Sequence, residues 1–137
     1  MPFVGAEKIV ENKKATRSLG HKVVTEILGD GLQVTDISTG SGATAEPGNM
    51  VKIEYQARLV ATGKEVDEGT VTIPLGAGRV IKGWDQGLQG LRVGGQRLLI
   101  VPPKLGYGDK DFKDIPAKST LEFDVKLLDV SKPGQRQ

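Results

Sequence analysis

The stretch VIKGWDQGLQGLRVGG, residues 80–95, has the hydrophobic spacing of a short helix and contains the only tryptophan of the chain. Ile81, Trp84, Leu88 and Leu91 follow one another at steps of three, four and three residues, which places them on one side of a helix of about three turns. The glycine pair at its end is typical of a helix C-terminus. Each internal glycine costs a helix roughly 1 kcal/mol relative to alanine, so we expect these glycines to allow close contact with neighbouring backbone.

The segments around this stretch have the pattern of β-strands. Residues 50–60 and 120–130 alternate apolar and polar side chains, as a strand with one buried face does. Three further strands are predicted at residues 32–38, 70–75 and 97–103, the last of which ends at two prolines. The sequence therefore predicts an α+β fold, in which a curved antiparallel sheet of about five strands packs against one short helix and Trp84 faces the sheet.

Length and composition indicate a single globular domain. The chain has 137 residues, 19 basic and 17 acidic side chains, a net charge of +2 and no cysteine. The charges are interspersed, so we expect no nucleic-acid partner. No run of about 18 apolar residues is present, so we expect no membrane segment and a cytoplasmic protein. We divide the chain into an N-terminal arm (1–30), a folded domain (31–130) and a C-terminal tail (131–137).

The predicted arm allows more than one interpretation. Its segment KVVTEIL, residues 22–28, could form a strand or a turn and a half of helix. A flexible or packing role is the simplest interpretation of the arm. The basic segment KKATR, residues 13–17, leaves nuclear targeting as an alternative.

The residue inventory excludes several catalytic classes within the predicted domain. The only histidine, His21, lies in the arm, so a Ser/His/Asp triad and a zinc site are not expected. The segment GAGRVIKG, residues 76–83, fits neither nucleotide-binding glycine motif. We therefore expect no metal and no cofactor. The remaining candidates are large side chains that could line a pocket or simply fill the core: Tyr55, Val66, Val71, Val80, Ile81, Trp84, Tyr107, Ile115 and Phe123.

Three linked motifs carry a family resemblance that extends from about residue 31 to 130. They are VIKGWDQGLQGLRVGG (80–95), LLIVPPKLGYG (98–108) and IPAKSTLEFDVKLLDV (115–130). By these motifs the chain resembles the FKBP-type peptidyl-prolyl cis-trans isomerases. The resemblance implies a half-wrapped sheet around a short helix and catalysis of X-Pro bond isomerisation in peptides and unfolded proteins. It also implies binding of the macrolides tacrolimus and rapamycin.

The resemblance further implies a pocket between the helix and the sheet. Trp84 matches the floor of that pocket, and Tyr55 and Phe123 match its aromatic walls. Val80 and Ile81 match the pair before the helix, where the N–H of Ile81 would donate to a ligand carbonyl.

Three more positions complete the implied pocket. Tyr107 matches a loop tyrosine whose hydroxyl bonds the ligand, Asp67 an aspartate at the pocket edge, and Ile115 an apolar residue of the last long loop. The resemblance assigns catalytic roles to Asp67, Tyr107 and Trp84.

The sequence departs from the family pattern beside Asp67. Val66 and Val71 stand where the family usually has aromatic residues, and the longer bulged segment that follows the aspartate, with its arginine, is missing. A second hypothesis is therefore a weakly active or inactive FKBP-fold module that binds partner proteins or acts as a chaperone. We expect a monomer in the cytoplasm, with the nucleus as a second location. Phe112, in the loop GDKDFKD (108–114), either folds over the pocket or does not.

Overall fold

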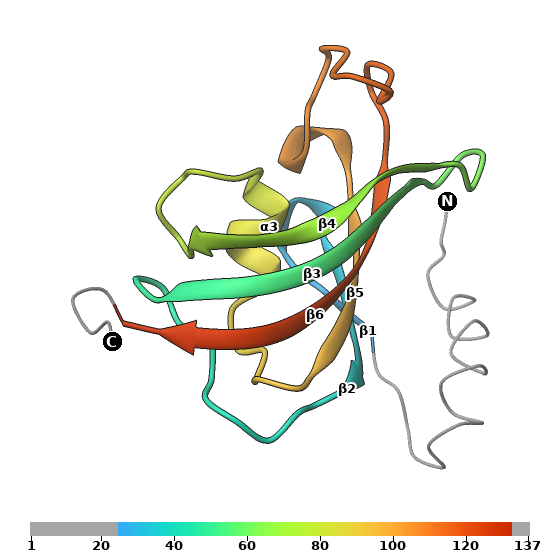
Figure 1. Cartoon of the computed structure of the whole chain (residues 1–137). Coiled ribbons are helices and arrows are strands. Elements are labelled where there is room, and N and C mark those ends of the chain that lie inside the picture. Colours follow the sequence, from blue (N-terminus) through green and yellow to red (C-terminus); the bar gives the residue numbers. More distant parts are fainter. Residues whose placement is uncertain (1–24, 133–137) are drawn as a thin grey trace.

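The computed structural model describes residues 25–132 and contains a curved sheet with one short α-helix. The helix α3 packs inside the curve of the sheet (Figure 1). The strands are β1 (Thr25–Ile27), β2 (Gln33–Ser38), β3 (Met50–Leu59), β4 (Glu65–Pro74), β5 (Gln96–Val101) and β6 (Leu121–Ser131). The helix is α3 (Lys82–Gly87), and two 3-10 turns are η1 (Gly29–Gly31) and η2 (Pro103–Leu105).

All strand pairs are antiparallel, and their order in the sheet is β1-β2-β5-β6-β3-β4. The strand β6 therefore lies between β5 and β3, although it is the last strand within residues 25–132. Its inward side chains Leu121, Phe123, Val125 and Leu127 are all buried. They meet the inward side chains of the two neighbouring strands and form the centre of the core.

The structure confirms the predicted α+β fold and extends the sheet. It has six strands where the sequence predicted about five, because β1 forms within the residues assigned to the N-terminal arm. The strand β4 begins at Glu65, five residues before the predicted 70–75. Residues 1–24 of the arm and residues 133–137 of the tail lie outside the described part of the chain, so the proposed roles of the arm stay predictions.

The helix is shorter than its hydrophobic spacing predicted. The α-helix ends at Gly87, yet Leu88 and Leu91 are fully buried beyond it. The physical reason is that the backbone after the helix finds another partner. Gly90, at φ 88°, donates its N–H to the Ala45 carbonyl at 2.9 Å, and Ala45 donates in turn to the Leu91 carbonyl at 2.8 Å. The apolar stripe thus continues on a loop that pairs with a distant segment.

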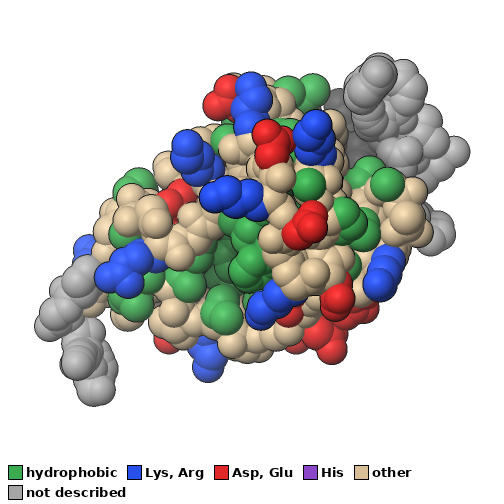
Figure 2. All heavy atoms as spheres, turned by 90° about the horizontal axis from the view of Figure 1, so that it is seen from above, with side chains coloured by type: hydrophobic (Ala, Val, Ile, Leu, Met, Phe, Trp, Pro, Cys, Tyr) green, Lys and Arg blue, Asp and Glu red, His purple; other side chains and the backbone are tan. Residues whose placement is uncertain are grey.

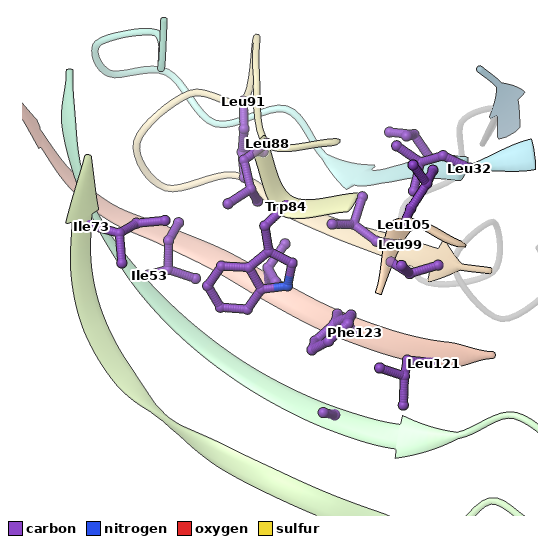
Figure 3. Packing of buried hydrophobic residues seen from close by; sticks show 14 of the residues in the cluster. Leu32, Ile53, Ile73, Trp84, Leu88, Leu91, Leu99, Leu105, Leu121 and Phe123 are labelled. Carbon is purple, nitrogen blue, oxygen red and sulfur yellow. The ribbon is translucent and has the colours of Figure 1, made fainter. Parts of the chain in front are cut away.

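Two helix glycines allow α3 to lie directly on the sheet, as expected from the sequence. A Cβ atom at Gly83 would lie 2.7 Å from a methyl carbon of Val101, and one at Gly87 would lie 2.9 Å from a methyl carbon of Leu99. Real Cβ atoms do not approach so closely, because cores are packed like organic crystals. This contact brings Trp84 over the sheet, among Ile53, Leu99 and Phe123 (Figure 3).

A buried arginine fixes the end of the helix. The side chain of Arg97, on β5, donates from Nη1 to the carbonyls of Gly87 and Gln89, both at 2.8 Å, and from Nε to Asp36 at 2.6 Å. A cation at a helix C-terminus satisfies carbonyls that have no partner within the helix. Arg97 therefore holds α3 to β5 and β2.

No helix within residues 25–132 is long and apolar enough to cross a membrane.

Candidate functional site

Three aromatic rings from three elements meet at the helix. Trp84, on α3, lies edge-to-face with Tyr55 of β3, with ring centroids 5.0 Å apart, and with Phe123 of β6, with centroids 5.5 Å apart. Both interplanar angles are 80°, the arrangement that aromatic quadrupoles favour. Trp84 is only 5 % exposed, whereas Tyr55 is half-buried. The indole therefore lies deep, and Tyr55 extends from it toward the surface.

The indole nitrogen of Trp84 has no hydrogen-bond partner among residues 25–132. Figure 3 shows this nitrogen on the side of the indole that is nearer to Phe123. Buried polar groups in folded proteins nearly always have a partner. The Nε1–H is thus a buried donor that the described part of the fold leaves unused.

Aliphatic side chains from two further segments surround these rings. Val66 and Val71 of β4, and Val80 and Ile81 before α3, are all half-buried and pack against the same core cluster. Ile115, from the last long loop, is buried in that cluster. Figure 2, a view from above relative to Figure 1, shows a recess with hydrophobic side chains in it and charged side chains around it. The predicted pocket residues therefore lie around one apolar core, with the valines in place of the family's aromatic rings.

Tyr55 and Asp67 form a hydrogen bond between neighbouring strands. The Tyr55 hydroxyl donates to Asp67 Oδ2 at 2.9 Å, and the other carboxylate oxygen accepts the backbone N–H of Glu68 at 2.9 Å. Partial burial, followed by the hydrogen bond to Asp67 and its negative charge, raises the pKa of Tyr55 to about 12. Tyr55 therefore stays protonated at physiological pH, and its hydroxyl is a hydrogen-bond partner of Asp67.

Tyr107 belongs to the same neighbourhood, but its ring is also held from the other side. It stacks on Phe112 with centroids 4.5 Å apart and planes 6° apart, and Lys113 Nζ lies 5.3 Å from the Phe112 ring. Burial and the nearby Asp67 charge raise the pKa of Tyr107. Of the two alternatives left open for Phe112, the structure has it packed on Tyr107, where it remains 40 % exposed.

The sequence prediction missed Asp85, which organises the segment before the helix. Its two carboxylate oxygens accept the backbone N–H groups of Gly76 at 2.8 Å and Gly78 at 2.9 Å. These bonds fix the turn that leads to Val80 and Ile81. The available signal was an acidic residue in the first helical turn directly after a glycine-rich loop.

The family model for FKBP-type peptidyl-prolyl cis-trans isomerases matches residues 41–128. The chain belongs to this family. It is 44 % identical over 125 residues to FK506-binding protein 4 of Mycosarcoma maydis, which covers 88 % of this chain and 33 % of that protein. It is 45 % identical over 111 residues to FK506-binding protein 3 of Candida albicans, covering 78 % of this chain and 26 % of the relative. The chain thus spans about a third or less of the length of these curated relatives.

Solved structures agree with the FKBP assignment. The FKBP domain described above superposes on AtFKBP13 with a TM-score of 0.69 and 33 % identity, over 77 % of this chain and 98 % of that one. It superposes on FkpA from Escherichia coli with a TM-score of 0.73 and 30 % identity, over 93 % of this chain and 61 % of FkpA. The half-wrapped sheet around a short helix is therefore the fold expected from the sequence resemblance.

Two other features of the FKBP domain lie apart from this aromatic cluster. A polar depression of about 500 Å³ on the outer face of the sheet is lined mainly by charged and amide side chains, among them Glu54, Glu68, Asp124 and Lys126. Within residues 25–132, no group of three or more His, Cys, Asp or Glu side chains is arranged to hold a metal ion. The predicted site residues other than Asp67 belong to or pack against one hydrophobic cluster, and Asp67 bonds Tyr55 beside it.

Proposed function

We propose that this domain catalyses cis-trans isomerisation of X-Pro peptide bonds in peptides and unfolded proteins, with Trp84 as the floor of the proline site. Family membership supports the reaction class. The observation that carries the proposal is the contact of Trp84 with both Tyr55 and Phe123 in a cluster on which half-buried aliphatic side chains pack. Such a surface fits a pyrrolidine ring, which is apolar and has the size of one side chain.

The chemistry requires selective binding of a twisted amide. Rotation about a peptide bond faces a barrier of about 18–20 kcal/mol because amide resonance is lost at the midpoint. The twisted amide has less charge separation than the planar one, so a dry apolar site favours it over the ground state. Each ~1.4 kcal/mol of this preference accelerates the reaction about tenfold.

Asp67 and Tyr107 have proposed roles at the edge of this site. Tyr55 holds the Asp67 carboxylate in place through its hydroxyl. Tyr107 is held by Phe112. In the proposed complex the Tyr107 hydroxyl and the Ile81 N–H bond the carbonyls of the substrate, while Val66, Val71, Val80 and Ile115 exclude water.

A protease-coupled assay on an X-Pro tetrapeptide tests the reaction. We expect a rate above the uncatalysed background, inhibited by tacrolimus, and a large loss of kcat/KM in Trp84→Ala. Gln86→Ala, an exposed change on the same helix, is the matched control. An isomerisation rate no higher than the uncatalysed background at micromolar protein concentration would refute the proposal.

The same pocket is proposed to bind tacrolimus and rapamycin. The names of the related FK506-binding proteins and the apolar recess support this extension. Calorimetric titration with each macrolide tests it, and we expect Trp84→Ala and Tyr107→Phe to weaken binding. Unchanged affinity in both variants would remove these residues from the pocket.

A second candidate function is a protein-binding or chaperone module with slight or no catalysis. Val66 and Val71 favour it, because two valines enclose less of the recess than aromatic rings would. Isomerisation that tacrolimus blocks would exclude this candidate. A monomeric state, a cytoplasmic or nuclear location and the lack of nucleic-acid and membrane partners stay predictions, which analytical ultracentrifugation, cell fractionation and binding assays can check.

A further inference from the structure

The strand β4 forms an edge of the sheet beside the aromatic recess. Within residues 25–132 it pairs only with β3, and residues 67–70 in its middle are exposed. Eight consecutive pairs, from Met50↔Pro74 to Ala57↔Asp67, continue without a register shift. Proteins usually interrupt such an edge with a bulge or a lysine, because a regular free edge invites another strand. Here the register shifts only at the start of β4, between Ala57 and Arg58, so the edge from Asp67 to Pro74 is continuous.

The pairing geometry shows which backbone groups this edge presents. Leu75 donates its N–H to the Asn49 carbonyl at 2.9 Å, one step beyond the pair Met50↔Pro74. Hydrogen-bonded and non-hydrogen-bonded pairs alternate along an antiparallel ladder. The odd-numbered residues of β4 therefore bond to β3. Glu68, Thr70 and Thr72 direct their N–H and C=O groups away from β3, toward the free edge.

Gly69, in the centre of this edge, has no reason to be glycine within the fold. Its φ angle is not in the left-handed region, and an added Cβ atom would lie 3.8 Å from the Tyr55 ring, an ordinary contact. Glycine weakens a strand, and inside one it often marks a place where a ligand or another backbone approaches closely. The position faces Tyr55, one of the three aromatic rings of the recess.

We propose that the substrate segment next to the X-Pro bond pairs with the free edge of β4 as an additional strand and passes over Gly69 on its way to the recess. This inference rests on the proposed isomerase function. The residue before proline is restricted to extended conformations, so the peptide arrives in a shape that can pair. Asp67 and Val71 belong to the same strand, so the path from pocket to edge is continuous.

Strand pairing also suits the class of substrate. Main-chain hydrogen bonds bind an extended peptide whatever its side chains, and alternate side chains add selectivity. Side chains on the outer face of the added strand would lie beside the polar depression that Glu68, Gly69 and Thr70 border. The edge thus fits unfolded segments of varied sequence.

The variant Thr70→Pro tests the pairing with Thr70→Ala as its control. Proline removes one outward N–H and leaves the hydrogen bonds to β3 in place, a position where edge strands tolerate it. Alanine keeps the N–H. The substrates are an X-Pro tetrapeptide and a peptide with the same core extended by about four residues on each side. In the wild type and Thr70→Ala we expect about tenfold higher kcat/KM for the extended peptide. Thr70→Pro should lose this advantage with unchanged tetrapeptide activity.

Equal kcat/KM for both substrates in the wild type, or a length advantage that survives in Thr70→Pro, would overturn the inference. If Thr70→Pro does not fold, amide exchange in the wild type decides the matter. A saturating extended peptide should slow exchange at Glu68, Thr70 and Thr72 and leave Val71 unchanged. Absence of this protection refutes strand pairing. A lack of activity on the tetrapeptide would instead refute the isomerase function, and the exchange measurement needs no turnover.

Discussion

The hydroxyl of Tyr55 reaches diagonally across the sheet to the carboxylate of Asp67, 2.9 Å away on the next strand. The residue directly opposite Tyr55 is Gly69, and Asp67 is opposite Ala57. The tyrosine ring lies beside Gly69, where an added Cβ atom would make an ordinary contact of 3.8 Å, and its hydroxyl extends to Asp67. A strand pair thereby positions one aromatic wall and one carboxylate together.

Replacing Asp67 should disturb the site more than the fold. Asp67→Ala removes the acceptor of the Tyr55 hydroxyl, and one hydrogen bond of this kind contributes about 1 kcal/mol. We expect kcat/KM on the tetrapeptide to fall about fivefold or more, with a small change in the urea midpoint. Glu65→Ala, an exposed carboxylate earlier on β4, is the control. Equal activity of the two variants would count against a role for Asp67.

The titration of Tyr55 should be visible because the chain has only two tyrosines. We expect phenolate absorbance to rise near pH 12 for Tyr55 instead of near its ordinary pKa of 10.0. The raised pKa means that the folded state favours the protonated form. This contribution to stability is complete below about pH 10 and is lost as the pH rises toward 12. In Tyr55→Phe the alkaline loss should be smaller, whereas identical alkaline unfolding would contradict the assignment.

Adding a methyl group at Gly83 should separate α3 from the sheet. The new Cβ would lie 2.7 and 2.8 Å from the two methyl carbons of Val101, and such overpacking costs about 1–3 kcal/mol. Chemical denaturation measures this loss. Gly29→Ala is the control, because a Cβ there meets nothing within 4 Å. Combining Gly83→Ala with Val101→Ala should cost less than the sum of the two single changes.

Removing the buried guanidinium should be the most destabilising polar change. Arg97→Met leaves the Gly87 and Gln89 carbonyls and the Asp36 carboxylate without their donor, and a hydrogen bond to a charged group contributes about 1.5–3 kcal/mol. Asp36→Asn should cost less, because the Asp36 side chain is more exposed than that of Arg97. Comparable stability of Arg97→Met and the wild type would show that the end of α3 does not need the hydrogen bonds from Arg97.

Asp85 should influence ligand binding through the turn before the helix. Asp85→Ala removes the acceptors of two backbone N–H groups, each bond contributing about 0.5–1.5 kcal/mol. We expect weaker tacrolimus binding and a higher KM with kcat less affected, while Asp85→Asn, which keeps one acceptor oxygen, should recover part of the affinity. An unchanged KM in Asp85→Ala would show that the turn is held by other contacts.

The strands with one buried face could be predicted from the sequence. Residues 50–60 and 120–130 became β3 and β6 because their alternation reflects one face on the core and one in water. The first half of β4 could not be predicted in this way. Most of its residues are exposed on an edge, so burial imposes no alternation on Glu65 to Thr70. The helix was predicted too long because Leu88 and Leu91 keep helical spacing on a loop that pairs with Ala45.

Part of the candidate site could also be predicted from the sequence, and part of it could not. Trp84, Tyr55 and Phe123 could be placed together, since the resemblance identified the positions and the structure brings the rings into contact. The partners of Asp67 and Asp85 could not be predicted. Asp85 bonds amides seven and nine residues away, and Tyr55 bonds Asp67 diagonally, two residues from its own cross-strand partner Gly69. Such bonds depend on where turns place the backbone.

The central place of β6 has a consequence for synthesis on the ribosome. The strand β6 lies between β5 and β3. The part of the sheet made of β1, β2 and β5 is therefore not joined to the β3–β4 pair until residues 121–131 have left the exit tunnel. Until then β3 can pair with β4 as a hairpin, and β2 can pair with β5 across a long stretch of sequence, but the sides of β3 and β5 that face β6 stay unpaired. Closure of the sheet therefore depends on the long-range contacts of β6 with β5 and β3.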